Sequence, residues 1–150
     1  MKRALRWTVT VAVALAAVAA FAKIPKLPQT GPEPVYDPAT AVEIWGVVVD
    51  VRRVPAKALE GVHLDVKTDG GVLDVYLGPS NFVEMFGVTF AKGDMVNVRG
   101  SQVRFQGADV VLAREIDRKL ETLYFRDESG EPMWKDLALP ETSRPAHAQR

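Results

Sequence analysis

The chain has 150 residues, with 19 Lys or Arg against 19 Asp or Glu, two His and no Cys. The absence of Cys excludes disulfides and thiolate chemistry. The balance of charge provides no excess of basic side chains for a phosphate backbone, so nucleic-acid binding is not favoured. A chain of this length forms one domain with a modest core.

The N-terminal 22 residues begin with three basic side chains, Lys2, Arg3 and Arg6. An apolar run follows them and ends in Ala-Phe-Ala. This order is typical of a secretory signal peptide. An uncleaved anchor is the alternative, but the run from Trp7 is shorter than the ~20 apolar residues of a membrane span. We expect cleavage near Ala22, a periplasmic or secreted protein and no span in the mature chain. Cleavage removes three basic residues and leaves 16 against 19 acidic ones.

Two segments flank the predicted domain. Residues 23–40 contain five prolines whose spacing prevents a helix or a central strand, so we predict an extended linker. Residues 129–150 are rich in Glu, Pro, Ser and Ala, and we predict a mostly disordered tail. The folded domain is therefore predicted to comprise residues 41–128.

Short alternating patterns begin the predicted domain. Residues 41–54 form the first predicted strand, which has four apolar residues on one face: Trp45, Val47, Val49 and Val51. Residues 61–67 and 71–77 form the next two, and their inward rows are predicted to be Val62, Leu64 and Val66 and then Leu73, Val75 and Leu77. Strict alternation indicates strands with one buried face.

One short helix interrupts the strands. Ser80 is predicted as the N-cap of a helix over residues 81–86, and Gly87 is placed to end it in the left-handed conformation. Residues 93–105 follow as a strand broken or bulged at Gly100, then residues 108–116 and a short last strand at 121–127.

This order of elements predicts the fold class. Three strands, a helix and two more strands are the order of the OB-fold, a five-stranded Greek-key barrel. Another small all-β barrel or sandwich is the alternative. We therefore predict an all-β protein with an OB-fold, one short helix between the third and fourth strands, and a short additional C-terminal strand.

The runs GVHLDVKTDGGVLDVYLGPSNF, GDMVNVRGSQV, VVLAREI and LYFRDESGEPMW carry a resemblance. Over residues 41–134 the chain resembles a group of small exported bacterial OB-fold proteins of uncharacterised function, some of which are labelled DNA-binding from their fold alone. The resemblance implies a fold and an exported location, and it implies no particular activity.

The turn between the second and third strands predicts their register. Asp69-Gly70 is a strong signal for a two-residue hairpin loop. Centring the turn there pairs His63 with Tyr76, Asp65 with Asp74 and Lys67 with Val72. Facing carboxylates repel each other unless a positive group lies between them. The outward face of this ribbon is also the usual binding face of OB-folds.

We therefore predict a ligand-binding site on this hairpin face. The candidate residues are His63, Asp65, Lys67, Asp74, Tyr76 and Trp134. The structural alternative is that Lys67, Arg52 or Arg53 neutralises the two Asp residues and that His63 stacks on an exposed Tyr76.

A metal site is the second hypothesis. His63, Asp65 and Asp74 combine imidazole with carboxylates on one face, which would suit Zn²⁺ or a copper ion. We expect no cofactor otherwise. An enzyme is not expected, since the sequence has no Ser/His/Asp spacing, phosphate loop or paired-His motif.

The closing motif LYFRDESGEPMW has two interpretations. Arg126, Asp127 and the Ser129-Gly130 turn resemble the end of a hairpin, after which Trp134 folds back over an open barrel edge. Alternatively, Trp134 covers a ligand groove. The function that we predict is an exported OB-fold binding or interaction module for a protein partner or small ligand, with nucleic acid unlikely; the alternative is a periplasmic metal-binding or metal-delivery protein.

Overall fold

The computed structural model describes residues 33–55 and 59–137. The predicted signal peptide, the first part of the predicted linker and the end of the predicted tail lie outside the described residues. The elements in chain order are a 3₁₀-helix η1 (Pro38–Thr40), β1 (Ala41–Val54), β2 (Gly61–Thr68), β3 (Gly71–Gly78), α1 (Ser80–Glu84), β4 (Met95–Phe105), β5 (Ala108–Arg118) and β6 (Glu121–Tyr124).

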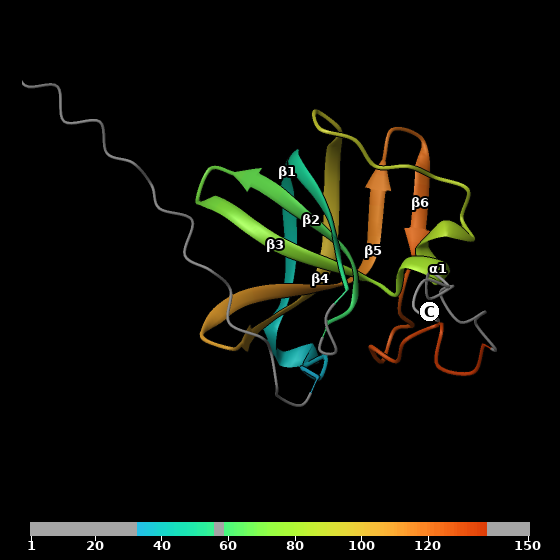
Figure 1. Cartoon of the computed structure of the whole chain (residues 1–150). Helices are drawn as coiled ribbons and strands as arrows, with labels where there is room; N and C mark the ends of the chain where they lie inside the picture. The colour runs from blue at the N-terminus through green and yellow to red at the C-terminus, as the bar shows by residue number, and fades with distance from the viewer. Residues whose placement is uncertain (1–32, 56–58, 138–150) are drawn as a thin grey trace, which may run out of the picture.

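Five strands close into a barrel, as Figure 1 shows. The strand order is β3-β2-β1-β4-β5-β6, and an additional parallel pairing of β3 with β5 joins the two ends of the five-stranded part. Within the described residues, β6 pairs with β5 alone and lies outside the closed barrel. The predicted fold class is confirmed: the barrel is all-β, with one short helix between β3 and β4 and a short last strand.

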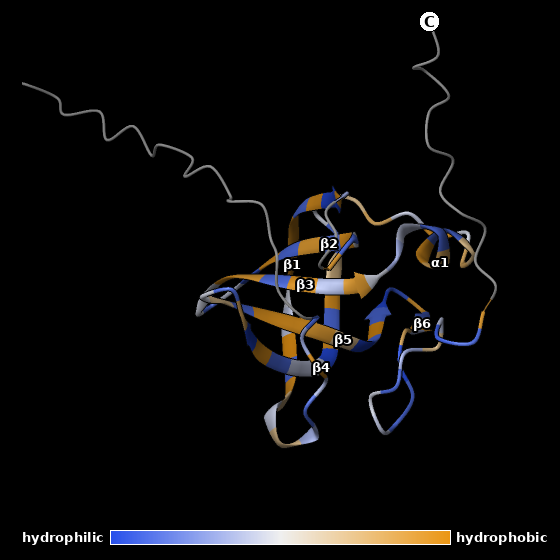
Figure 2. Ribbon diagram, turned by 60° about the horizontal axis from the view of Figure 1, so that its bottom comes forward, coloured by the Kyte–Doolittle hydropathy of each residue, from blue (hydrophilic) through white to orange (hydrophobic). Residues whose placement is uncertain are grey.

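The barrel interior holds the main core. The predicted inward rows of the hairpin are buried or partly buried there: Val62, Leu64, Val66, Leu73, Val75 and Leu77. Figure 2 shows hydrophobic and hydrophilic residues alternating along the strands. This alternation buries one face of each strand inside the barrel.

The face predicted for β1 is wrong over most of its length. Ile44 and Val48 are buried in the core, whereas Trp45 is 71% exposed and Val47 and Val49 also face solvent. Both rows of β1 are apolar, so the pattern could not decide between them. A register shift between Val48 and Asp50 inserts one extra residue. Beyond this extra residue the other row of β1 faces the core, and Val51 packs against the core as predicted.

The helix begins differently from the prediction. Ser80 is its first residue, and Pro79 occupies the N-cap position without a side-chain cap. Pro79 has the extended backbone of an N-cap residue, and its ring has no group that could accept a hydrogen bond from the helix. The helix ends at Glu84, two residues before the predicted end, and Gly87 has the predicted left-handed conformation with φ of 65°. Phe82 and Val83 close the barrel interior.

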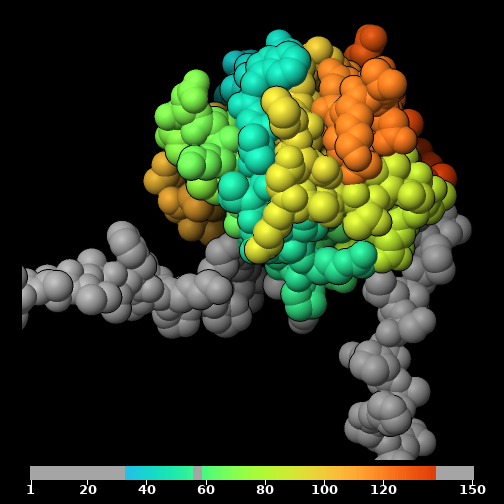
Figure 3. All heavy atoms as spheres, turned by 90° about the horizontal axis from the view of Figure 1, so that it is seen from above, coloured from blue at the N-terminus to red at the C-terminus, as the bar shows by residue number. Residues whose placement is uncertain are grey.

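The segment between α1 and β4 ties two parts of the barrel together. Gly93 N donates to Val48 O at 2.8 Å, and Arg118 Nη1 donates to Thr89 O at 2.5 Å. Figure 3 shows this segment in yellow between β1 and the β5–β6 hairpin. The register between β4 and β5 shifts at the predicted position, between Arg99 and Gly100, but the extra residue is Arg114 of β5, so β4 itself is neither broken nor bulged.

Both flanking segments contribute to the fold where the structure describes them. Residues 33–40 are not simply extended, since η1 forms within them and Asp37 N donates to Ser101 Oγ at 3.0 Å. Residues 129–137 likewise pack on the barrel, and Trp134 contacts both apolar clusters. The folded domain therefore reaches beyond residues 41–128. No helix within the described residues is long and apolar enough to cross a membrane.

Candidate functional site

The β2–β3 hairpin has the predicted register but not the predicted exposure. His63 pairs with Tyr76, and Asp65 pairs with Asp74. His63 is only 3% exposed and Tyr76 only 5% exposed, so they do not form an outward surface. A second apolar cluster lies over this part of the ribbon: Leu59, Phe105, Val110 and Leu112, with Tyr36, Val103 and Trp134 packed against it.

A single arginine neutralises the facing carboxylates. Arg52 Nη2 lies 2.6 Å from Asp65 Oδ1 and 3.0 Å from Asp74 Oδ1. Burial alone would raise the pKa of Asp74, but the hydrogen bond and charge of His63 and the charge of Arg52 outweigh burial and lower it. Lys67, which lies on β2 like Asp65, is exposed. The structural alternative is thus correct for Arg52, which balances the repulsion between the two Asp residues.

Internal hydrogen bonds occupy the imidazole of His63. Nδ1 lies 2.7 Å from Asp74 Oδ1, and Nε2 lies 2.8 Å from the carbonyl oxygen of Leu59. Both ring nitrogens therefore face oxygen atoms of the protein itself and not an open site. Among residues 33–55 and 59–137, no group of three or more His, Cys, Asp or Glu is placed to hold a metal. The geometry therefore does not support the Zn²⁺ or copper hypothesis.

A pocket of about 690 Å³ opens beside the buried end of the hairpin. Tyr76 and Trp134, both candidates from the sequence, line it. Burial raises the pKa of Tyr76, and its hydroxyl donates to Glu60 O at 3.1 Å. The other walls are residues 33–36, 59–60, 79–81 and 129–132, with Leu112 and Arg126. The pocket thus joins the predicted hairpin face to both flanking segments.

Two glycines let the aromatic walls approach the barrel. A Cβ on Gly78 would lie 2.8 Å from Cζ3 of Trp134, and a Cβ on Gly130 would overlap Cδ1 of Tyr36. Both glycines have positive φ, at 146° and 90°. Trp134 therefore lies against the end of β3 and forms part of the pocket wall.

Arg126 is the functional candidate that sequence reasoning missed. It is only 5% exposed, and its guanidinium carbon lies 4.9 Å from the Trp134 ring centre and 5.7 Å from that of Tyr76. Nη1 donates to Ala113 O at 2.5 Å. No local pattern in the sequence placed this arginine in a pocket. Tyr36 was also missed, because it lies within the predicted linker.

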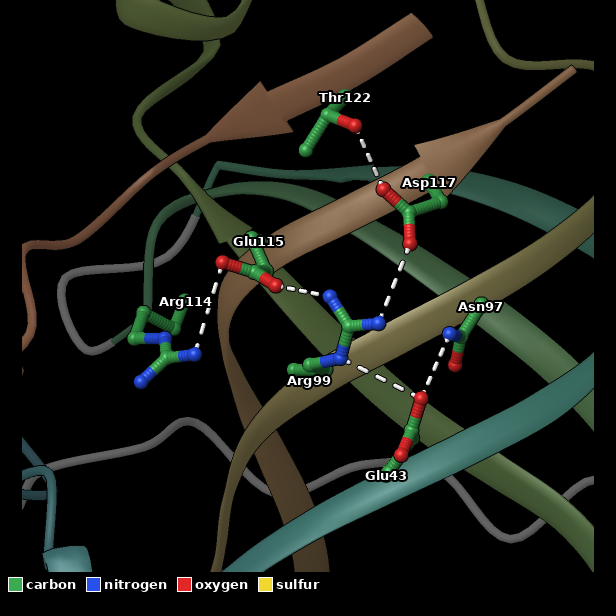
Figure 4. A network of polar contacts seen from close by, with 7 residues as sticks. All are labelled: Glu43, Asn97, Arg99, Arg114, Glu115, Asp117 and Thr122. Atoms are coloured by element: carbon green, nitrogen blue, oxygen red, sulfur yellow. Dashed lines mark hydrogen bonds and ion pairs between the residues drawn. The ribbon is translucent and has the colours of Figure 1, made fainter. Parts of the chain in front are cut away.

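A polar network covers a different face of the barrel. Arg99 of β4 forms ion pairs with Glu43, Glu115 and Asp117, which belong to its two neighbouring strands, as Figure 4 shows. The hydrogen bond to Glu115 raises the pKa of Arg99 most strongly. The network links β1, β4 and β5 across the sheet, which is a structural role.

Two comparisons with known proteins differ in outcome. The comparison with curated proteins found no match, whereas a family model matches this chain. The model of the MamS/MamX magnetosome protein family matches residues 40–123, more than half of the chain. The match covers the hairpin, α1 and most of the range over which the sequence resembles small bacterial OB-fold proteins, and it stops before Arg126 and Trp134. The chain therefore belongs to the MamS/MamX magnetosome protein family.

Proposed function

We propose that this chain is an exported binding or interaction module that holds a small ligand or a protein partner, not nucleic acid, in the pocket between Tyr76 and Trp134. Membership of the magnetosome family suggests a binding or interaction role in magnetosome formation. The observation that carries the proposal is the pocket itself, about 690 Å³ in volume with three aromatic walls and a buried arginine.

The place of the pocket in the fold supports this role. OB-folds bind ligands on the outer face of their second and third strands. Here the β3 residue Tyr76 contributes to the pocket, and Leu59 and Glu60 of the β1–β2 loop form part of its wall. Ligand sites are concave and place a few polar groups beside aromatic walls, and this pocket is lined by both aromatic and polar side chains.

The charges around the pocket argue against nucleic acid. The pocket is lined by a single arginine and by three glutamates, Glu33, Glu60 and Glu131. A groove for single-stranded nucleic acid requires basic side chains along the backbone path. We expect only weak binding of an oligothymidylate at physiological salt. A sub-micromolar affinity that falls steeply with salt would contradict the proposal.

A binding role is favoured over catalysis by the state of the histidine. His63 is the only histidine among the described residues, and both its ring nitrogens bond within the protein. It is not among the residues that line the pocket. A general base must be within reach of the reacting group, which this arrangement does not offer.

Photo-crosslinking in magnetosome-forming cells that produce the protein would test the proposal. Benzoylphenylalanine would replace Val35, which lines the pocket and is exposed, and, as a control, Leu120, which is exposed in the β5–β6 turn. We expect a discrete adduct from position 35 that is absent from position 120. The same adduct from both positions, or none from position 35, would contradict the pocket as the binding site.

Export is a separate part of the proposal and rests on the pattern of residues 1–22. Intact-mass measurement of the protein from the cell envelope or medium should give a chain that begins at Lys23. A mature protein that retains residues 1–22 would contradict cleavage near Ala22.

A further inference from the structure

Arg126 differs from every other arginine that the structure describes. Six of the seven arginines in residues 33–55 and 59–137 have a carboxylate oxygen within 3.5 Å: Arg52, Arg53, Arg99, Arg104, Arg114 and Arg118. Arg126 forms no ion pair within these residues, and it is the only one of the seven that is buried. A buried cation without an anionic partner is unfavourable, so its position calls for an explanation.

The contacts of the Arg126 side chain leave most of its hydrogen-bonding capacity unused. Its one side-chain hydrogen bond within the described chain is from Nη1 to Ala113 O, although a guanidinium has five N–H donors. The rings of Tyr76 and Trp134 offset part of the charge by cation–π attraction. Both rings line the pocket, as does Arg126, so the guanidinium lies at the pocket wall.

Arg126 remains charged at neutral pH. Burial lowers the pKa of this guanidinium to about 10, still far above neutrality. A planar, permanently charged fork with free donors is the group that proteins use to bind carboxylates through two parallel hydrogen bonds.

The rest of the pocket restricts the anion. Tyr36, Tyr76 and Trp134 provide flat apolar surfaces on which a ring or a similar group can stack. Glu33, Glu60 and Glu131 line the same pocket, and Lys135 pairs with Glu131. The charges of Glu33 and Glu60 repel an anion more strongly the more charge it carries. A doubly charged phosphate is therefore less favoured than a singly charged carboxylate.

We propose that Arg126 binds the carboxylate of a ligand whose flat apolar part lies among Tyr36, Tyr76 and Trp134. The inference rests on the proposed function, because it assigns a ligand class to the same pocket. This chemistry is found both in a free aromatic acid and in the C-terminal residue of a peptide that ends in an aromatic side chain.

Titrations of the ¹⁵N-labelled protein followed by NMR would test the ligand class. The probes are phenylacetate, its neutral analogue phenylacetamide and the more highly charged phenylphosphonate, at constant ionic strength. We expect each acid to shift the Trp134 indole and the backbone signals of residues 126–134. Phenylacetate should bind at least about tenfold more tightly than the amide, as loss of charge-assisted hydrogen bonds requires, and more tightly than the phosphonate.

Rim variants provide a readout that does not depend on the folding of an Arg126 variant. Glu60→Gln removes one repelling charge from an exposed rim position and should tighten phenylacetate binding about twofold while leaving phenylacetamide unchanged. Glu128→Gln, exposed but not in this pocket, is the matched control and should change neither. Arg126→Lys should reduce the preference for the acid over the amide, because an ammonium lacks the planar fork.

The outcomes separate this inference from the proposed function. If the NMR signals of Trp134 and residues 126–134 give equal affinities for phenylacetate and phenylacetamide, the carboxylate assignment is overturned and the pocket remains a binding site. Shifts at neither Trp134 nor residues 126–134 with any probe would overturn the assignment and count against the pocket itself. Comparing phenylacetate with Ac-Gly-Gly-Phe and its C-terminal amide would then show whether a free acid or a peptide terminus is preferred.

Discussion

Arg52 donates a 2.6 Å hydrogen bond from Nη2 to Asp65 Oδ1 and so joins β1 to β2. The same nitrogen lies 3.0 Å from Asp74 of β3. One guanidinium therefore links three consecutive strands and compensates two carboxylates that face each other on the ribbon. All three side chains are partly shielded from solvent, which strengthens the interaction relative to an exposed ion pair.

Replacing Arg52 should destabilise the barrel. Arg52→Gln leaves the facing Asp residues without their cation, and we expect the free energy of unfolding to fall by roughly 1–2 kcal/mol. The adjacent Arg53 is the matched control, since its ion pair with Glu84 is exposed. Arg53→Gln should change stability by less than about 0.5 kcal/mol. Urea denaturation of both variants measures the difference, and equal effects would contradict the bridging role.

The stability of the protein should depend on Asp74 ionisation in acid. The folded pKa of Asp74 is lowered, because the contributions of His63 and Arg52 exceed the opposing effect of burial. Such a group stabilises the fold fully above its unfolded pKa of about 3.9, and this contribution is lost as the pH falls through the folded value. The stability difference between wild type and Asp74→Asn should therefore shrink below about pH 4. A difference that stays constant from neutral pH into acid, measured by urea denaturation, would contradict this.

Gly78 should be required for the position of Trp134. A Cβ at Gly78 would lie 2.8 Å from the indole ring, whereas one at Gly71 would meet nothing within 4 Å. Both glycines have positive φ, so Gly71→Ala controls for backbone strain alone. We expect Gly78→Ala to cost at least about 1 kcal/mol more than Gly71→Ala, as overpacking does. It should also shift the Trp134 indole signal in NMR spectra, and an unchanged signal would contradict the contact.

The exposed row of β1 should tolerate polar substitution. Trp45 is 71% exposed, and Trp45→Ser should alter the free energy of unfolding by less than about 0.5 kcal/mol. Val48 is buried on the opposite face, and Val48→Ala should cost roughly 1–3 kcal/mol. Thermal and chemical denaturation compare the two. A larger loss for Trp45→Ser would mean that the inward face of β1 is the one predicted from the sequence.

Several features could be predicted from local sequence because local interactions decide them. The Asp69-Gly70 turn and the strict alternation on either side of it set the hairpin register from His63 to Thr68, as observed. The pairing departs from the prediction only at Val62, where a register shift pairs it with Gly78. The order of the predicted strands, with one short helix before Gly87, likewise predicted the barrel.

The candidate site could be predicted only in part. Tyr76 and Trp134 were identified and do line one pocket, and Asp65 and Asp74 do face each other. The burial of His63 could not be foreseen, since the side chains that cover this ribbon come from Leu59, Tyr36 and the end of β4.

The sequence by itself thus determined the class of fold, the hairpin register and the pairing of its polar residues, because turn chemistry and alternation act between near neighbours. Only the tertiary structure decided which row of β1 faces the core, since both rows are apolar and a bulge reverses them. It also decided that Arg126 is buried between Tyr76 and Trp134 without a carboxylate partner in residues 33–55 and 59–137. Burial and charge pairing depend on segments distant in the chain, and no local pattern records which of them will meet.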